Sequence, residues 1–505
     1  MGNLRPLRDL RLREGKEAGV SQSVRKLTRN EYPFRNRASL NIALTRVSMP
    51  TSESSASPAW PTSDSLANGF DAQHPPDPKL IDACVHCGFC LTTCPSYRVL
   101  GTEMDSPRGR IYLMDAINNG EAPLSATSAK HFDSCLGCLA CTTSCPSGVQ
   151  YDKLIAAVRP QVERHHQRPL VERMVRSLIF SLFPYPTRLR AVAGPLYLYQ
   201  KLGISKLVQK TGLLAKLSPS LAAMDALLPP ITAESFQDDL PELVPAVGTQ
   251  RYRVGMVLGC VQRVFFSDVN AATARVLAAN GCEVVIPHEQ GCCSALPAHQ
   301  GQEAQAQELA RRMIDCFEAA EVDYVVINAA GCGHTLKEYH HILQDDPEYC
   351  ERAKAFVAKV RDVQEFLAQV GLVTPLHPIA EGNLPIVYQD ACHLLHGQKI
   401  SLQPRQLLKQ IPGVSLREPL DAALCCGSAG VYNMLHPEVA AELGQMKVRT
   451  LLNTGAALVA SPNPGCSLQI QQHMEKQEKS MPLFHPMELL DCSIRGVPLP
   501  LEKPI

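Results

Sequence analysis

The sequence predicts a multidomain protein of mixed α+β and α/β class, in which a helical, cysteine-bearing domain precedes two copies of an α/β domain. Two observations predict this arrangement. The runs DACVHCGFCLTTCP and DSCLGCLACTTSCP share one cysteine spacing, and a wider pattern of four cysteines occurs twice between residues 260 and 466. With 505 residues and 45% hydrophobic content, the chain is long enough for several cores, at roughly 150 residues per domain.

The predicted boundaries divide the chain into five segments. These are an N-terminal extension over 1–76, the helical cysteine domain over 77–158, a basic helical linker over 159–248, and the two repeated domains over 249–375 and 376–505. The formal net charge is zero, which gives no indication of nucleic-acid binding, and we expect none.

The N-terminal extension is expected to be disordered. Residues 1–48 carry eleven Arg or Lys against four acidic residues, and residues 49–76 are rich in Ser, Pro, Ala and Thr, so neither stretch favours a buried core. An Arg-rich, Ser-rich and acid-poor start is typical of an organellar transit peptide. Met49 would equally serve as the start after a translated leader, and the role of this segment stays open.

The two cysteine runs predict two [4Fe–4S] clusters. Each run reads C-x2-C-x2-C-x3-C followed by proline, the spacing of two-cluster ferredoxins, in which the fourth cysteine of each run ligates the other cluster. The first cluster is therefore expected on Cys84, Cys87, Cys90 and Cys145, and the second on Cys135, Cys138, Cys141 and Cys94.

Zinc and disulfides are the alternatives for these cysteines. Structural zinc usually takes two separated pairs of ligands, whereas each run here supplies four thiols within eleven residues. Disulfides need an oxidising compartment, and the sequence shows no export signal, so we expect a cytoplasmic location. Iron–sulfur clusters are favoured over both.

Two further stretches around these runs carry charge. Arg108 and Arg110 lie in the connector between the runs, where they would either pack the two loops together or raise the cluster potentials. Between residues 159 and 216 there are eleven Arg or Lys and two acidic residues, interleaved with apolar stretches. Such a basic amphipathic region indicates either a packed helical linker or a peripheral contact with an anionic membrane surface.

The C-terminal half contains an internal repeat of cysteines. The first set is Cys260, Cys292, Cys293 and Cys332, and the second is Cys392, Cys425, Cys426 and Cys466, offset by 132 to 134 residues. An apolar stretch precedes each cysteine site, and four of the six stretches are β-rich, with helical patterns between them. This alternation predicts parallel α/β units with the cysteines at the carboxyl ends of strands, where ligands gather. Each set therefore predicts a metal or redox site, the alternative being packing of small buried side chains.

Together the motifs ACVHCGFCLTTCP, CTTSCPSGVQYDKL, GCCSALPAH, GCGHTLKEY and LCCGSAG resemble the iron–sulfur subunit of glycolate oxidase (glycolate dehydrogenase) from about residue 78 to the end. The resemblance implies two ferredoxin-type clusters, two cysteine-rich CCG domains, and flavoprotein partner subunits whose FAD oxidises glycolate, and also D-lactate in some members. Electrons would then pass through this chain to a quinone or another carrier. The sequence holds no G-x-G-x-x-G after a strand and no Walker loop, so we expect no catalytic residues for substrate oxidation here.

The CCG sets depart from those of heterodisulfide reductases, where the third site reads C-x-x-C. Thr335 and Gln469 occupy the matching positions, and Ser294 replaces glycine in the first repeat, whereas Gly427 keeps it in the second. The second repeat is therefore the better candidate for a cofactor, with His396 as a weak extra ligand. The remaining cysteines are read as packing residues: Cys282, Cys316, Cys350 and Cys492.

Two alternative functions stay open. In one, the CCG domains are themselves catalytic and reduce a disulfide or a quinone, as in heterodisulfide reductase or the anaerobic glycerol-3-phosphate dehydrogenase cluster subunit. In the other, the CCG domains only dock the flavoprotein, and the clusters hold the fold.

Overall fold

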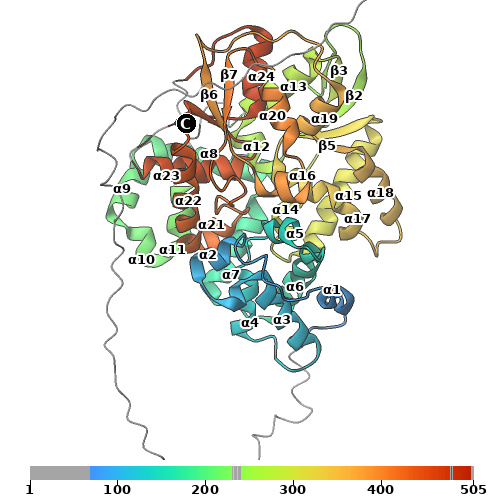
Figure 1. Cartoon of the computed structure of the whole chain (residues 1–505), viewed down its shortest axis with the longest axis vertical. Helices are drawn as coiled ribbons and strands as arrows, with labels where there is room; N and C mark the ends of the chain where they lie inside the picture. Colours follow the sequence, from blue (N-terminus) through green and yellow to red (C-terminus); the bar gives the residue numbers. More distant parts are fainter. Residues whose placement is uncertain are drawn as a thin grey trace, which may run out of the picture. The chain divides into compact units, whose positions relative to one another are not determined.

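The computed structural model describes residues 69–501, apart from 230, 232–235, 237–239, 478 and 480. These residues belong to one compact unit that spans Pro61–Ile505 (Figure 1). The expectations for residues 1–68, among them the transit peptide and the start at Met49, lie outside the described residues. The predicted fold class is confirmed, because a helical domain is followed by two α/β domains with parallel sheets.

The helical cysteine domain is built from short helices, and no strand is described between residues 69 and 229. Its elements are α1 (Pro78–Asp82), α2 (Pro95–Leu100), the 3-10 helix η2 (Glu103–Asp105), α3 (Pro107–Asn118), α4 (Ala126–Asp133), α5 (Ala140–Ser144) and α6 (Tyr151–His165). Proline at the first position fixes φ for the starts of α1, α2 and α3. The core between α3, α4 and α6 contains Met114, Phe132, Leu154 and Val158.

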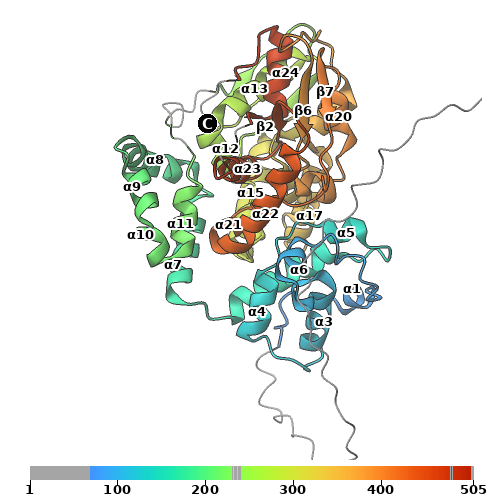
Figure 2. The same cartoon turned by 60° about the vertical axis from the view of Figure 1, so that its left-hand side comes forward.

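Five α-helices lie in the part of the linker that the structure describes. They are α7 (Leu170–Leu182), α8 (Pro186–Lys201), α9 (Ile204–Thr211), α10 (Leu213–Leu217) and α11 (Pro219–Ala226). The predicted boundary between residues 158 and 159 falls inside α6, which continues through Pro160 to His165. Figure 2 shows the linker helices alongside the CCG domains, where α8 contacts α12 and α11 contacts α21.

The first CCG domain carries a five-stranded sheet in the order β1-β3-β2-β4-β5, parallel except for β1. Its strands are β1 (Leu243–Val244), β2 (Tyr252–Val257), β3 (Cys282–Val285), β4 (Tyr324–Ile327) and β5 (Val360–Asp362). Its helices are α12 (Cys260–Phe265), α13 (Ser267–Ala279), α14 (Ala295–Ala298), α15 (Glu303–Ala319), α16 (Ala330–Lys337), α17 (Tyr339–Ile342), α18 (Cys350–Lys359) and α19 (Val363–Val370). Burial on both faces accounts for the apolar runs at 254–257 in β2 and 325–327 in β4.

The second CCG domain repeats this topology with four parallel strands in the order β7-β6-β8-β9. Its strands are β6 (Leu384–Tyr388), β7 (Val414–Arg417), β8 (Leu458–Ala460) and β9 (Leu483–Phe484). Its helices are the π-helix η4 (His393–Gly397), α20 (Leu402–Leu408), α21 (Tyr432–Leu435), α22 (Pro437–Leu452), α23 (Pro464–Glu475) and α24 (Pro486–Arg495). The sequence did not indicate β7, which has four residues. The apolar stretch before Cys466 contains β8, but this three-residue strand lies in a stretch that is not β-rich.

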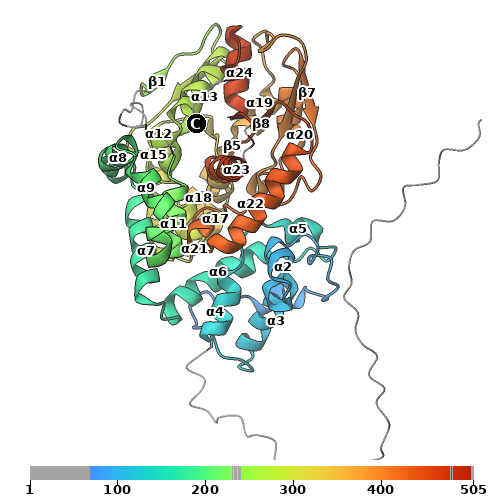
Figure 3. The same cartoon turned by 90° about the vertical axis from the view of Figure 1, so that its left-hand side faces the viewer.

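The two CCG domains share one hydrophobic core. Helix α24, at the end of the second domain, packs on α13 of the first, and α19 of the first packs on α20 of the second (Figure 3). Arg275 on α13 makes a bidentate ion pair with Asp491 on α24, with N–O distances of 2.9 and 2.7 Å. The carboxyl ends of both parallel sheets carry the repeated cysteines, and the paired domains hold these two edges in a fixed relationship.

Candidate functional site

Two cavities in the helical cysteine domain are each lined by thiols from both cysteine runs. The first is lined by Cys84, Cys87, Cys90, Cys141 and Cys145. The second is lined by Cys94, Cys135, Cys138 and Cys141. The fourth cysteine of each run therefore lines the same cavity as the first three of the other run, and Cys141 lines both cavities. A [4Fe–4S] cluster takes four thiolates, and each cavity offers at least four thiols.

An arginine supports the backbone of each cysteine loop. Arg108 donates from Nη1 to the carbonyl oxygen of His86 at 3.0 Å and from Nε to Glu103 at 2.7 Å. In the second loop, Arg159 donates from Nη2 to the carbonyl oxygen of Cys135 at 2.8 Å. The sequence did not indicate this role of Arg159, because Arg159 lies on α6, 24 residues after the carbonyl group that it binds.

Arg110 is the buried cation of this domain. Its side chain is 0% exposed and donates to the hydroxyls of Ser96 and Ser134 at 3.0 and 2.8 Å. Burial disfavours the thiolate of Cys135, but Arg110 and Arg159 outweigh it and hold the pKa of this thiol below its usual value. The positive charge beside Cys135 stabilises its thiolate, and it would also stabilise a negatively charged group bound to that thiolate.

The four cysteines of each CCG domain converge at the carboxyl edge of its sheet. In the first domain, Cys292 Sγ lies 3.5 Å from Cys260 Sγ, and hydrogen bonds from the thiols of Cys292 and Cys332 lower the pKa of Cys293 well below its usual value. In the second domain, Cys425 and Cys466 act in the same way on the pKa of Cys426.

Both CCG sites therefore favour a thiolate on the second cysteine of the pair, and a thiolate is the form that binds metal or attacks a disulfide. All twenty cysteines lie among the described residues and none is in a disulfide. Among the residues that the structure describes, no group of three or more His, Cys, Asp or Glu side chains is arranged to hold a single metal ion.

The residue after each cysteine pair adopts a left-handed backbone conformation, with φ of 63° at Ser294 and 89° at Gly427. A Cβ atom on Gly427 would lie 2.6 Å from the carbonyl oxygen of Ala440, so this position has no room for a side chain. The difference between CCS and CCG in the two repeats thus follows from the packing of α22 against the second loop.

Three histidines lie close together between the CCG domains, with His334 buried and His299 and His393 half-buried, and the sequence did not indicate this group. The ring centroid of His393 lies 4.8 Å from that of His299 and 4.9 Å from that of His334. Burial lowers the pKa of all three, that of His393 to about 3, so the three rings are neutral at physiological pH. Each of these histidines lies near a CCG motif in the sequence. An isolated histidine belongs to no repeated spacing, so the sequence does not predict which other histidines lie beside it.

His396 makes polar contacts that join two domains. Its Nδ1 atom lies 2.8 Å from the hydroxyl of Thr143 on α5, and Nε2 lies 3.5 Å from the carbonyl oxygen of Ala423. Both ring nitrogens thus face polar protein atoms. Among the cysteines outside the repeats, Cys282 and Cys492 pack in the shared core, and Cys316 and Cys350 are partly exposed.

The second cysteine loop of the helical domain packs directly on the second CCG site. Leu136 and Cys138 share one cluster of packed side chains with Cys392, Leu424 and Cys425. His393 lies with Nε2 2.9 Å from the carbonyl oxygen of Gly137, and the hydroxyl of Tyr432 donates to the carbonyl oxygen of Ser134 at 3.1 Å. No residue of the first cysteine run belongs to this cluster of packed side chains.

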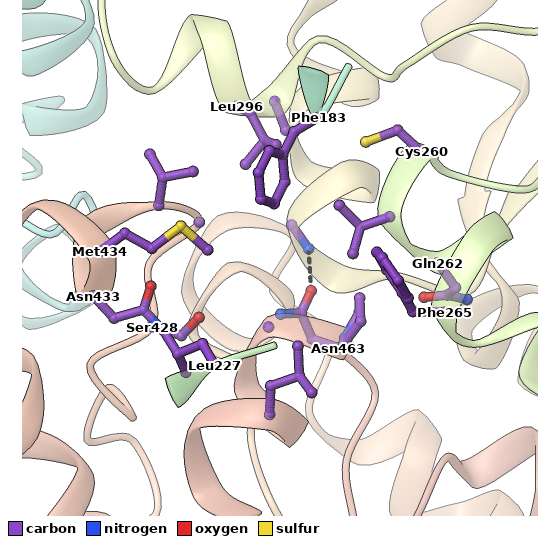
Figure 4. Close-up of a pocket in the computed structure, with 18 of the residues that line it drawn as sticks. Phe183, Leu227, Cys260, Gln262, Phe265, Leu296, Ser428, Asn433, Met434 and Asn463 are labelled. Carbon is purple, nitrogen blue, oxygen red and sulfur yellow. Dashed lines mark hydrogen bonds between the residues drawn. The ribbon is translucent and has the colours of Figure 1, made fainter. Parts of the chain in front are cut away.

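An apolar cavity of about 820 Å³ lies between the CCG domains and the linker helices. Figure 4 shows Cys260, Phe265 and Leu296 of the first CCG domain lining the same space as Asn433 and Met434 of the second. Of the eight cysteines that form the two repeated CCG sets, all except Cys292 line this cavity. In the part of the chain that the structure describes, no helix is long and apolar enough to cross a membrane.

This combination of two thiol-lined cavities and two cysteine-lined α/β domains defines an iron–sulfur protein built for electron transfer. The comparisons with known proteins agree: residues 80–149 match a 4Fe-4S dicluster domain, and residues 254–337 and 386–471 each match the cysteine-rich domain family. Residues 171–228 match the linker region of the glycolate oxidase iron-sulfur subunit.

Curated relatives cover most of the chain. The probable glycolate oxidase iron-sulfur subunit of Bacillus subtilis (strain 168) is 39% identical over 396 residues, which cover 78% of this chain and 89% of the relative. The glycolate oxidase iron-sulfur subunit of Escherichia coli (strain K12) is 33% identical over 401 residues, 78% of this chain and 90% of the relative.

Lactate utilization protein A of Exiguobacterium sp. (strain ATCC BAA-1283 / AT1b) is 28% identical over 242 residues, 48% of this chain and 98% of the relative. The chain belongs to the glycolate oxidase iron-sulfur subunit family, whose members are subunits of an oxidoreductase.

Proposed function

We propose that this chain receives electrons from glycolate oxidation on flavoprotein partner subunits and passes them to a quinone or another carrier. The observation that carries the proposal is the pair of thiol-lined cavities, each built from both cysteine runs. Family membership supports glycolate as the source of electrons, and the likeness to lactate utilization proteins supports lactate as a second source, which we propose to be D-lactate. FAD would reside on the partners.

The proposed ligands of the two [4Fe–4S] clusters are Cys84, Cys87, Cys90 and Cys145 for the first, and Cys135, Cys138, Cys141 and Cys94 for the second. Clusters bound there would accept and release single electrons, which lets a flavin hand over its electrons one at a time. Arg110 and Arg159 lie beside the second set, so their positive charge would raise its reduction potential.

The partner flavoprotein is proposed to dock over the first set. Cys87 is exposed, and three large apolar side chains close to it, Val85, Phe89 and Tyr112, are between 63% and 67% exposed. Exposed apolar side chains gathered around a functional group are typical of a protein interface. Docking at this face would bring the flavin close to the most accessible thiols of the domain.

The second CCG set is the proposed destination within this chain, as a redox-active or metal-binding site. Support comes from the cluster of side chains that contains both Cys138 and Cys392. The first CCG set is proposed to have the same capacity, because Cys260, Cys292, Cys293 and Cys332 converge in the same way. We propose a peripheral position on the cytoplasmic membrane face for the complex.

Replacement of Cys90 by Ser tests the proposed function. In the complex with its flavoprotein subunits, Cys90→Ser should abolish transfer from glycolate to the terminal acceptor, while glycolate still reduces the partner's flavin. Cys350→Ser is the matched control, because Cys350 begins α18, away from both thiol-lined cavities. Full turnover with the natural acceptor in Cys90→Ser would refute the proposed role of the first set.

A further inference from the structure

We propose that the 820 Å³ cavity between the CCG domains and the linker helices binds a membrane quinone and is the place where it is reduced. The inference rests on the proposed function for its source of electrons. The volume falls within the roughly 300–1,000 Å³ that is typical of pockets for small organic ligands.

The wall formed by the linker is mainly apolar, although Arg188, Tyr199 and Asp225 also line it. Leu182 and Phe183 close α7, Leu189 and Leu196 lie on α8, and Leu227 follows α11, and all of them line the cavity. Leu178 also lines the cavity but is 46% exposed, so it marks an opening to the surface. A ligand in this space would be mainly hydrophobic with a few polar groups, because most of the lining side chains are apolar and a minority are polar.

The opposite wall carries the redox groups. Thiols of both CCG sets line it, together with His299 and His393. Asn433 also lines the cavity, and its buried Oδ1 atom accepts no hydrogen bond among the described contacts. Such an unused acceptor fits a hydroxyl group of a ligand. The two walls together call for a molecule that is both hydrophobic and able to take up electrons.

The outer surface of the same helices resembles a membrane-binding surface. Leu198, Leu202, Leu207 and Leu217 are between 55% and 70% exposed on α8 to α10 and the turns that follow them. Exposed lysines are interleaved with them: Lys201, Lys206, Lys210 and Lys216. Exposed leucines with lysines at their edges suit the boundary of an anionic bilayer. A quinone dissolved in that bilayer would need to cross only this layer of helices to reach the cavity.

The reaction balances with the proposed source of electrons. Oxidation of glycolate to glyoxylate on the partner releases two electrons and two protons. The quinone takes up two electrons, and each of its two carbonyl oxygens gains a proton from water, which gives the quinol. The sum is glycolate plus quinone giving glyoxylate plus quinol, with no further oxidant or reductant.

The test is the binding of decylubiquinone, a short-chain quinone, to the intact complex in detergent, measured by equilibrium dialysis without glycolate. Val192→Trp fills the cavity from α8, and its matched control is Ala191→Trp, at the exposed neighbouring position. We expect one saturable site per chain, weakened at least about tenfold by Val192→Trp and unchanged by Ala191→Trp. Equal affinity in Val192→Trp and wild type, or no saturable binding, would overturn the proposal.

Two readouts keep this test separate from the proposed function. Glycolate-driven reduction of the iron–sulfur signals should persist in Val192→Trp, because the cavity lies after them on the proposed route. If glycolate fails to reduce these signals in the wild-type complex but the quinone still binds, the proposed function fails and the site stands.

A third measurement uses the wild-type complex, so it tests the site even if Val192→Trp does not fold. An azido-quinone crosslinked to the wild-type complex should label peptides from α8 or from residues 428–434. Labelling confined to other peptides would refute the site.

Discussion

His393 contacts Gly137 across the boundary between the second CCG domain and the helical cysteine domain, with 2.9 Å between its Nε2 atom and the glycine carbonyl oxygen. Each residue stands beside cysteines, because His393 follows Cys392 and Gly137 lies between Cys135 and Cys138. The contact therefore fixes the distance between a proposed cluster site and a CCG site, and electron transfer depends on that distance.

His393→Ala should weaken this junction. The carbonyl of Gly137 would lose its donor in a buried position, which costs about 1–3 kcal/mol, and the imidazole would leave a gap between the domains. Thermal unfolding of the anaerobic, cluster-loaded chain measures the loss. His340→Ala serves as the control, since His340 is exposed on α17. Equal melting temperatures for the two variants would show that the contact is without effect on stability.

Arg159→Gln should lower the reduction potential of the second proposed cluster. The variant removes one positive charge beside Cys135, and a loss of about 1 kcal/mol in electrostatic stabilisation corresponds to roughly 40 mV for one electron. A redox titration followed by EPR measures the shift. Arg164→Gln on the same helix is the control, because Arg164 pairs with Asp71 and Glu303. An unchanged reduction potential of the second proposed cluster in Arg159→Gln would contradict the proposal that the charge of Arg159 raises this potential.

Gly427→Ala should destabilise the second CCG domain by about 2–4 kcal/mol. The new Cβ would meet the carbonyl oxygen of Ala440 at 2.6 Å, and the left-handed φ of 89° adds backbone strain. Ser294→Gly, the equivalent position in the first domain, should change stability by less than about 1 kcal/mol. Urea unfolding of both variants tests the contrast, and a Gly427→Ala chain as stable as wild type would rule out the clash.

His473 should make the chain less stable in acid. Burial lowers its pKa from 6.5 to about 4 in the folded protein, so between these values the unfolded chain binds more protons than the folded one. The stabilising contribution is complete above about pH 6.5 and is lost as the pH falls towards 4.

His473→Leu should therefore reduce the loss of stability between pH 7.5 and 5.0 by up to about 2 kcal/mol. Denaturant unfolding at the two pH values measures it. Parallel losses in wild type and variant would mean that another group is responsible.

The sequence predicts the chemistry-bearing cysteines because their spacing is local or repeated. The first four-cysteine run lies in the loop that ends at the start of α2, and the second runs from a loop through α5. The offset of 132 to 134 residues shows the duplication of the CCG cysteines directly. Parallel α/β topology then brings Cys260, Cys293 and Cys332 to one sheet edge without any knowledge of side-chain contacts.

Features that depend on tertiary packing could not be predicted in this way. The packing of α24 on α13 joins segments more than 200 residues apart, and no local pattern in either helix specifies the other. Strand β8 has three residues and ends in alanine, so it lacks the β-branched run that identifies β4. The cluster of His299, His334 and His393 and the large cavity arise only when both domains and the linker are assembled.

Iron and acid-labile sulfide per chain, measured on anaerobically purified protein together with the EPR spectrum of its reduced form, test the central claim most directly. The account predicts at least about eight irons and eight sulfides, with two interacting [4Fe–4S] signals. Cys135→Ser should remove about half of the iron of the two ferredoxin-type sites and abolish the interaction between the signals. About four irons or fewer in the wild-type chain, or a single isolated signal, would contradict the assignment of two clusters to the eight cysteines.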